Sequence, residues 1–171
     1  MKLFVIYIGG AHEKSLIELH DMRFVVANTI EETYETLRNT WWGIPTSLHL
    51  DAWGVLNYAD GYSLKISHTP PEQNDKKLYF VNLGGYDSHQ FTELHQNVFV
   101  VAPDEAQAKH KAVQQITQWE SPHRDYLHQI DILLDVNQLL ATSNYYLHLE
   151  KETNPQPFEF TCRYTPIGKL R

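Results

Sequence analysis

The sequence predicts an α+β protein of two tandem ββαββ repeats, packed as one compact body with a largely antiparallel sheet and the helices on one side. Residues 2–27 and 77–102 align without a gap and are identical at 11 of 26 positions. The 75-residue offset is too long for a solenoid unit, so we expect a duplicated supersecondary block. Apolar and polar residues also alternate over residues 158–165, which predicts an extra C-terminal strand.

The same patterns divide the chain into four segments. Pro70-Pro71 and the polar residues that follow them separate the two copies and are typical of a linker. We therefore expect a first repeat over residues 1–66, a linker over 67–76, a second repeat over 77–150 and a tail strand within 151–171.

The first strand of each copy is a short apolar run that ends in two glycines. Residues 3–8 are continuously apolar, which is typical of a strand buried on both faces. Gly9-Gly10 follow this run, and Gly84-Gly85 follow its counterpart. We expect these glycines to end the strand and to provide either a positive φ or a close backbone approach.

The next strand begins with a Glu-x-His segment in each copy, Glu18 to His20 and Glu93 to His95. A period of two places Glu18 and His20 on the same face as Phe24 and Val26. Since Phe24 and Val26 should face a core, we expect the glutamate and histidine to point toward the same interior or its rim.

A helix and a pair of strands complete each predicted repeat. Residues 29–32 fit a capping box, and residues 104–107 fit an N-cap after Pro103. The strand after the first helix places His49 and Asp51 on one face. Asp60-Gly61 then predicts a tight turn, for which Ser143-Asn144 stands in the second copy.

Net charge, apolar runs and cysteine content disfavour several classes of protein. A formal net charge of -7 disfavours binding to nucleic acid. No apolar run approaches the roughly 18 residues needed to span a bilayer, so we expect no membrane segment. The single cysteine, Cys162, excludes an intrachain disulfide and fits a reducing compartment, so a cytoplasmic location is expected.

Several short motifs together resemble a known family. They are the Ile-Gly-Gly strand end, the Glu-Leu-His and Phe-Val-Val-Ala segments, Leu-His-Leu-Asp and the Asp-Gly-Tyr turn. The chain resembles a two-copy member of the bacterial domain-of-unknown-function family numbered 1543, over residues 2–66 and 77–150. It departs from the pattern at Asn82 and at Ser143-Asn144. The resemblance implies a bacterial origin and no established activity.

The candidate site is the seam between the repeats, where two carboxylates and two imidazoles would meet. The candidate ligand-binding residues are Gly9, Gly10, Glu18, His20, Gly84, Gly85, Glu93 and His95. A divalent metal is the alternative ligand, with candidate ligands His20, His95, Glu18, Glu93, His49 and Asp51. A purely structural role stays open, in which each glutamate accepts hydrogen bonds from its own Gly-Gly turn and each histidine satisfies a buried carbonyl.

Three functions follow from these patterns. The first is a non-catalytic protein that binds a small ligand or a partner at the seam, with no cofactor. The second is a divalent-metal-dependent hydrolase that uses the paired Glu-x-His segments. The third is a homodimer formed through residues 158–165, because an apolar face on a terminal strand favours self-association.

Overall fold

The computed structural model of the chain describes residues 1–72, 75–115, 129–154 and 156–168. It is an α+β protein built on antiparallel sheets. The chain divides into two compact units: the first unit is Met1–Tyr58, Leu64–Ile66 and Pro155–Arg171, and the second unit is Ala59–Ser63 and Ser67–Asn154. No helix in the described residues is long and apolar enough to cross a membrane.

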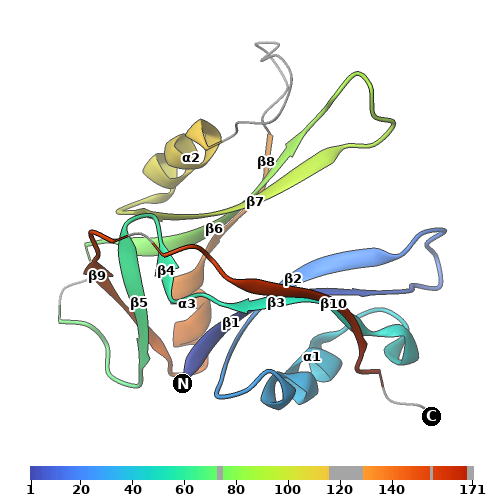
Figure 1. Cartoon of the computed structure of the whole chain (residues 1–171), viewed down its shortest axis with the longest axis horizontal. Coiled ribbons are helices and arrows are strands. Elements are labelled where there is room, and N and C mark those ends of the chain that lie inside the picture. The colour runs from blue at the N-terminus through green and yellow to red at the C-terminus, as the bar shows by residue number, and fades with distance from the viewer. Residues whose placement is uncertain (73–74, 116–128, 155, 169–171) are drawn as a thin grey trace. The chain divides into compact units, whose positions relative to one another are not determined.

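The first unit contains a four-stranded antiparallel sheet and its covering helix (Figure 1). The strand order is β10-β3-β1-β2, with β1 between β3 and β2. The strands are β1 (Lys2–Gly10), β2 (Leu19–Ala27), β3 (His49–Val55) and β10 (Phe160–Pro166), and the helices are η1 (Glu31–Thr33), α1 (Tyr34–Thr40) and η2 (Pro45–Ser47). The predicted C-terminal strand is therefore present and pairs with β3.

Both glycine pairs are the last two residues of their strands and are paired within the ladder, so each strand ends with its glycines rather than before them. Gly9 and Gly10 pair with His20 and Leu19 at the end of β1. Gly84-Gly85 likewise complete β6 (Lys77–Gly85). Among the described glycines only Gly61 has a positive φ. Close packing, described below, is the reason for a glycine at position 9.

The core of the first unit lies between the sheet and α1. Its buried residues are Phe4, Ile6, Ile8, Ala27, Leu37, Trp41, Leu48, Leu50 and Ile167. Val25 packs against this cluster and Ala27 belongs to it, so the core under α1 lies on the face of Val25 and Ala27, while Phe24 and Val26 are partly buried on the other face. Because side chains alternate along a strand, Gly9 and His20 lie on the opposite face of the sheet.

The two predicted helix starts differ in their outcome. Residues 29–32 form no side-chain N-cap in the structure; instead Glu32 accepts hydrogen bonds from the backbone and side-chain nitrogens of Asn28. In α2 (Glu105–Gln114), by contrast, the N-cap Asp104 accepts a hydrogen bond from the backbone of Gln107, as expected.

The second unit contains a three-stranded sheet with the order β7-β6-β8. Its strands are β6, β7 (Leu94–Ala102) and β8 (Gln129–Asp135), and α2 covers one face through Ala108 and Ala112 (Figure 1). The pairing of β6 with β7 runs from Lys77↔Ala102 to Gly85↔Leu94, while that of β1 with β2 runs from Lys2↔Ala27 to Gly10↔Leu19. The two pairings thus share one register at the 75-residue offset. Duplication of an ancestral unit stays a prediction.

A short helix after β8 was missed by the sequence patterns. α3 (Val136–Ala141) has Asp135 as its N-cap, and the Asp135 side chain accepts a hydrogen bond from the backbone of Gln138. Asn144 does adopt a positive φ of 59°, but it follows this helix, and the Tyr145 backbone N–H donates to the Leu140 carbonyl. Ser143-Asn144 is therefore a helix C-terminus rather than a hairpin turn, since Asn tolerates the left-handed conformation there.

A third sheet has the order β4-β5-β9, with β4 (Tyr58–Ala59), β5 (Tyr62–Ser67) and β9 (Tyr146–Lys151). The turn between β4 and β5 is the predicted one, with φ of 48° at Asp60 and 84° at Gly61. The side chain of Asp60 has a second role. Its Oδ2 accepts a hydrogen bond of 2.8 Å from the backbone of Val101 and one of 2.7 Å from Lys111 Nζ.

Replacing Asp60 with alanine should lower the free energy of unfolding by about 2 kcal/mol, because two hydrogen bonds to a carboxylate are lost and alanine disfavours positive φ. Asp60→Asn is the matched control, since Asn keeps an acceptor oxygen and tolerates this φ. Urea unfolding of both variants measures the effect. An equal loss in both would show that the charge, rather than the turn conformation and hydrogen bonding, matters most.

Candidate functional site

A row of three residues crosses the sheet of the first unit on the face opposite α1. Gly9 on β1 pairs with His20 on β2 and with His49 on β3. Neighbouring strands are about 4.8 Å apart, so the two histidine side chains can meet only over the central residue. A Cβ at Gly9 would lie 2.7 Å from His49 Nε2, 2.8 Å from Asp51 Oδ2 and 2.9 Å from His20 Cδ2. The missing side chain of Gly9 therefore creates the space in which these groups approach.

An irregularity in β3 orients Asp51 into this space. Tyr7 pairs with Ala52 and Ile8 with Leu50, so Asp51 has no partner on β1. The pairing of β10 with β3 shifts at the same place, between Cys162 and Thr165. Such bulges re-aim side chains and are frequent beside functional sites. His49 and Asp51 share a face, as the sequence predicted.

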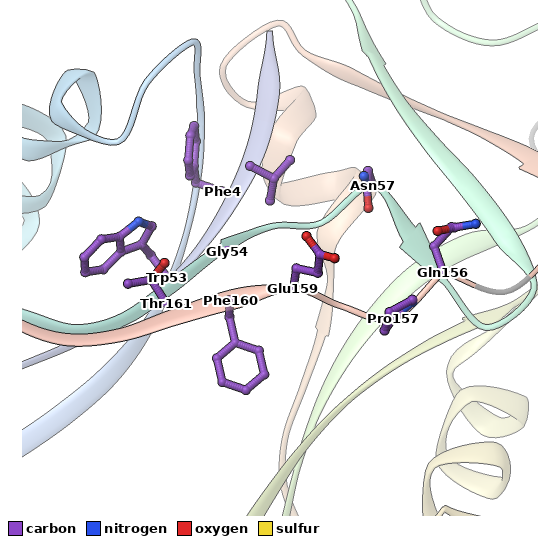
Figure 2. Close-up of a pocket in the computed structure, with 10 residues that line it drawn as sticks. Phe4, Trp53, Gly54, Asn57, Gln156, Pro157, Glu159, Phe160 and Thr161 are labelled. Carbon is purple, nitrogen blue, oxygen red and sulfur yellow. The ribbon is translucent and has the colours of Figure 1, made fainter.

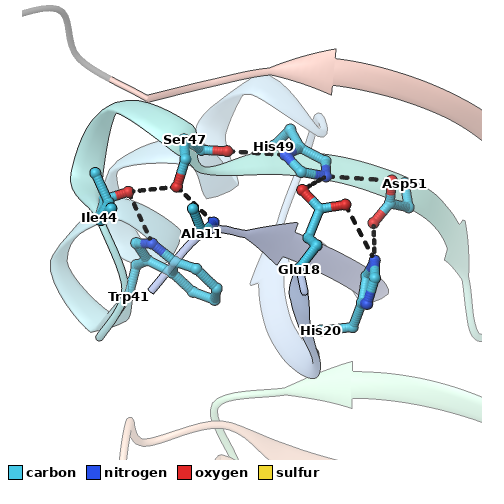
Figure 3. A network of polar contacts seen from close by, with 8 residues as sticks. All are labelled: Ala11, Glu18, His20, Trp41, Ile44, Ser47, His49 and Asp51. Atoms are coloured by element: carbon cyan, nitrogen blue, oxygen red, sulfur yellow. Dashed lines mark hydrogen bonds and ion pairs between the residues drawn. The ribbon is translucent and has the colours of Figure 1, made fainter. Parts of the chain in front are cut away.

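Four polar side chains converge around Gly9, and we name them the Gly9 cluster: Glu18, His20, His49 and Asp51 (Figure 3). Nε2 of His49 lies 3.3 Å from Glu18 Oε1 and 3.4 Å from Asp51 Oδ1. Nε2 of His20 lies 3.7 Å from Glu18 Oε2 and 3.4 Å from Asp51 Oδ2. Each carboxylate thus presents one oxygen to each imidazole.

The orientation of His49 is fixed by the backbone that precedes β3. Its Nδ1 lies 2.8 Å from the carbonyl oxygen of Ser47, and because a carbonyl only accepts, Nδ1 carries the hydrogen. Ser47 is held in turn, since its Oγ accepts a hydrogen bond from the Ala11 backbone and donates one to the Ile44 carbonyl (Figure 3). In the neutral imidazole, Nε2 therefore presents a lone pair to the two carboxylates.

Burial makes this arrangement unusual. The side chain of His49 is 1% exposed, and the ring of Tyr164 lies 4.4 Å from it, centroid to centroid. Nε2 of His49 and Oδ2 of Asp51 are both buried and neither makes a hydrogen bond. A buried polar atom without a hydrogen bond is unfavourable by roughly 1–3 kcal/mol. His49 Nε2 faces Glu18 Oε1 and Asp51 Oδ1, and Asp51 Oδ2 faces His20 Nε2. Neither of these two buried atoms makes a hydrogen bond.

The other imidazole is more accessible. His20 is about one third exposed and stacks on Tyr7, with ring centroids 5.2 Å apart and planes 3° apart. Burial raises the pKa of the Tyr7 phenol, and the negative charges of Asp51 and Asp21 raise it further. The carboxylates of Glu18 and Asp51 favour a cation over an anion at this face.

The second unit has only part of the same arrangement. His95 Nε2 lies 3.8 Å from Glu93 Oε2, and Gly84 pairs with His95 on β7. On its other side Gly84 pairs with Gln129, at the position that His49 occupies opposite Gly9. Among the described residues of the second unit, no histidine therefore occupies the position equivalent to His49.

Five of the predicted site residues come together within the first unit. Glu18, His20, His49, Asp51 and Gly9 meet within the first unit. A Cβ at Gly10 would lie 2.7 Å from the ring of Trp41 and 2.9 Å from Ser47 Oγ, so Gly10 allows the packing that supports Ser47. The approach of Glu93 and His95 to the first pair stays a prediction, because these residues belong to the other unit.

Sequence reasoning missed three residues that shape the cluster: Ser47, Tyr7 and Tyr164. Ser47 acts through its backbone carbonyl, for which a sequence has no signal. Tyr164 comes from a strand more than 110 residues away from His49 and was assigned only to an apolar face. Tyr7 could have been found, because it lies two residues before Gly9 on one strand and so shares its face.

The donor atoms of the Gly9 cluster do not form a complete set of metal ligands in the structure as it stands. In the part of the chain that the structure describes, no three His, Cys, Asp or Glu side chains are arranged to hold a metal ion as they stand. Glu18 precedes β2 and its side chain is 46% exposed, so it is the donor with the most freedom to move.

A separate cavity of about 500 Å³ lies beside β3 and the segment that leads into β10 (Figure 2). It is lined by Trp53, Gly54, Asn57, Gln156, Glu159 and Phe160 among others. None of the four residues of the Gly9 cluster lines it. Its lining has one carboxylate and no histidine among the described residues, so it lacks the convergent ionisable groups that distinguish the cluster.

Comparisons with known proteins place the chain in a family. Residues 15–66 match the model of a Domain of Unknown Function (DUF1543), a range that contains the whole Gly9 cluster. Among solved structures, the chain is similar to a crystal structure of a protein Il1583 from Idiomarina loihiensis, with 32% sequence identity, 99% of each chain covered and a TM-score of 0.74. A search of curated proteins finds no match. The chain belongs to the DUF1543 family.

Proposed function

We propose that the protein is a binding protein and that the Gly9 cluster is its ligand site. The observation that carries this proposal is the pair of buried atoms without a hydrogen bond, His49 Nε2 and Asp51 Oδ2. Buried polar atoms nearly always have a partner in folded proteins. A ligand that contacts both atoms would satisfy them, which supports a binding role over a purely structural one.

The sequence had left open the structural role, and the contacts support it less well. In that role Glu18 would accept hydrogen bonds from the Gly-Gly segment, but Gly9 and Gly10 lie in the strand ladder and the Glu18 oxygens lie near the two imidazoles. His49 does satisfy a carbonyl through Nδ1, but this leaves its Nε2 directed at the carboxylates.

Stability measurements separate the two roles. A site kept for binding retains contacts that are unfavourable without its ligand, so a substitution that relieves them stabilises the protein. Asp51→Asn removes one of two adjacent negative charges, and its amide can donate to Nε2 of His49. We expect the free energy of unfolding in urea to rise by about 1 kcal/mol.

The matched control is Asp21→Asn in β2. Asp21 accepts a 2.7 Å hydrogen bond from the Met22 backbone and pairs with Arg23, so its substitution should lower stability by about 1 kcal/mol or less. If Asp51→Asn instead destabilises the protein like Asp21→Asn, the carboxylate serves the fold and the binding proposal is overturned.

The two other predicted functions remain separate proposals. Hydrolysis by a bound ion would use the same donors, but it also requires a coordinated water and a place for substrate beside it.

Self-association through residues 158–165 would use the side chains of Phe160 and Tyr164, which are 62% and 63% exposed. A mass measurement in solution tests it: Phe160→Ser should be monomeric where the unsubstituted protein is dimeric.

A further inference from the structure

The geometry points to a divalent transition-metal ion of the zinc type as the ligand of the Gly9 cluster, held by His49, His20, Asp51 and Glu18. This inference rests on the proposed binding function and names the class of ligand. It draws on the state of His49, the donor spacing, the donor chemistry and the contrast between the two units.

The first argument is the state of His49. Metal-bound histidines almost always donate their second ring N–H to a carbonyl or carboxylate, which fixes the ring and directs the other lone pair at the ion. Nδ1 of His49 makes this contact with the Ser47 carbonyl, and its buried Nε2 has no hydrogen bond. The backbone contact therefore already holds one ligand in its binding orientation.

The second argument is the spacing of the donors. Zinc binds imidazole nitrogen and carboxylate oxygen at about 2.0–2.1 Å, so two ligands of a tetrahedral site lie about 3.4 Å apart. The four nitrogen–oxygen distances in the cluster are 3.3, 3.4, 3.4 and 3.7 Å. They are longer than good hydrogen bonds and close to the separation of two ligands around an ion. Each carboxylate turns a different oxygen to each imidazole, so binding one ion would require one oxygen of each carboxylate to turn toward both rings.

The third argument is the chemistry of the donors. Two imidazoles with two carboxylates suit zinc, nickel or manganese, whereas magnesium and calcium prefer oxygen alone. The two carboxylates, Asp51 and Glu18, would offset the charge of a divalent ion. Glu18, whose side chain is 46% exposed, is the donor with the most freedom to turn toward a bound ion.

The fourth argument is the contrast between the units. The second unit keeps the Glu-x-His segment as Glu93 and His95 but has Gln129 in place of His49. We therefore assign the ion to the first unit. This contrast also suggests His49→Gln as the test substitution. Gln129 occupies the equivalent position in β8, so a glutamine is compatible with a strand at that position.

The experiment titrates chelator-treated full-length protein with ZnCl₂ by isothermal calorimetry and follows the melting temperature. We expect one zinc ion per chain and a rise in melting temperature. His49→Gln and Asp51→Asn should each weaken zinc binding by about tenfold or more, since each removes or neutralises a ligand. His95→Ala, in the other Glu-x-His segment, should bind like the unsubstituted protein.

The outcomes distinguish the two proposals. Equal zinc binding by the unsubstituted protein, His49→Gln and Asp51→Asn would assign the ion to other histidines and overturn the inference. No binding of Zn²⁺, Ni²⁺ or Mn²⁺, together with a stabilising Asp51→Asn, would overturn the metal assignment and leave the binding function intact. No metal binding together with a destabilising Asp51→Asn would overturn both. Weaker zinc binding by His95→Ala would show that the second Glu-x-His segment contributes to the site, which would overturn the assignment of the ion to the first unit.

Discussion

Replacing Leu37 with alanine is expected to lower the free energy of unfolding by about 2–5 kcal/mol, the range for a large core side chain cut to a methyl group. Leu37 is fully buried and is the one buried residue of α1. A seven-residue helix has little stability of its own, so its position depends on this contact. Urea unfolding followed by circular dichroism measures the loss.

The matched control is Leu16→Ala, which makes the same chemical change at a fully exposed position in the loop between β1 and β2. A change within about 0.5 kcal/mol is expected there, as for most surface substitutions. If the two variants lose equal stability, α1 does not hold the core of the first unit together as described.

Replacing Gly9 with alanine should destabilise the protein by about 3 kcal/mol, at the upper end of the usual range for an overpacked site. The added Cβ would lie under 3.0 Å from atoms of His49, Asp51 and His20 at once. The backbone of Gly9 is paired on both sides, so it cannot easily move away. The melting temperature and the zinc titration described above would both report the change.

A double substitution tests whether the clash with His49 is the cause. Combining Gly9→Ala with His49→Ala removes the nearest contact, so the pair should lose less stability than the sum of the two single substitutions. Strict additivity would mean that the methyl group at position 9 is accommodated without pressing on His49. The importance of Gly9 would then need another explanation.

The sequence predicted most of the strands and part of the site. Alternation placed His49 with Asp51 on one face and Glu18 with His20 on another strand, because side-chain direction follows directly from a period of two. The Asp60-Gly61 turn and the Asp104 cap were also found, since both depend on short segments with strong local preferences.

The errors arose where local patterns have more than one structural outcome. For Gly9-Gly10 the sequence left open a positive φ or a close backbone approach, and the structure has the close approach within the strand. Ser143-Asn144 were interpreted as a hairpin, but the same positive φ also ends a helix. The sequence patterns assigned no element to residues 136–141, where the structure has the short helix α3.

By itself the sequence determined the α+β class, the strand faces and the residue types available for chemistry, because these follow from periodicity and composition. Only the tertiary structure decided that His20 and His49 meet over Gly9, that the bulge at Asp51 turns a carboxylate toward both, and that Ser47 fixes the His49 ring. The physical reason is that strand order, register and backbone contacts join residues distant in the chain. No local pattern encodes which neighbour a strand will have.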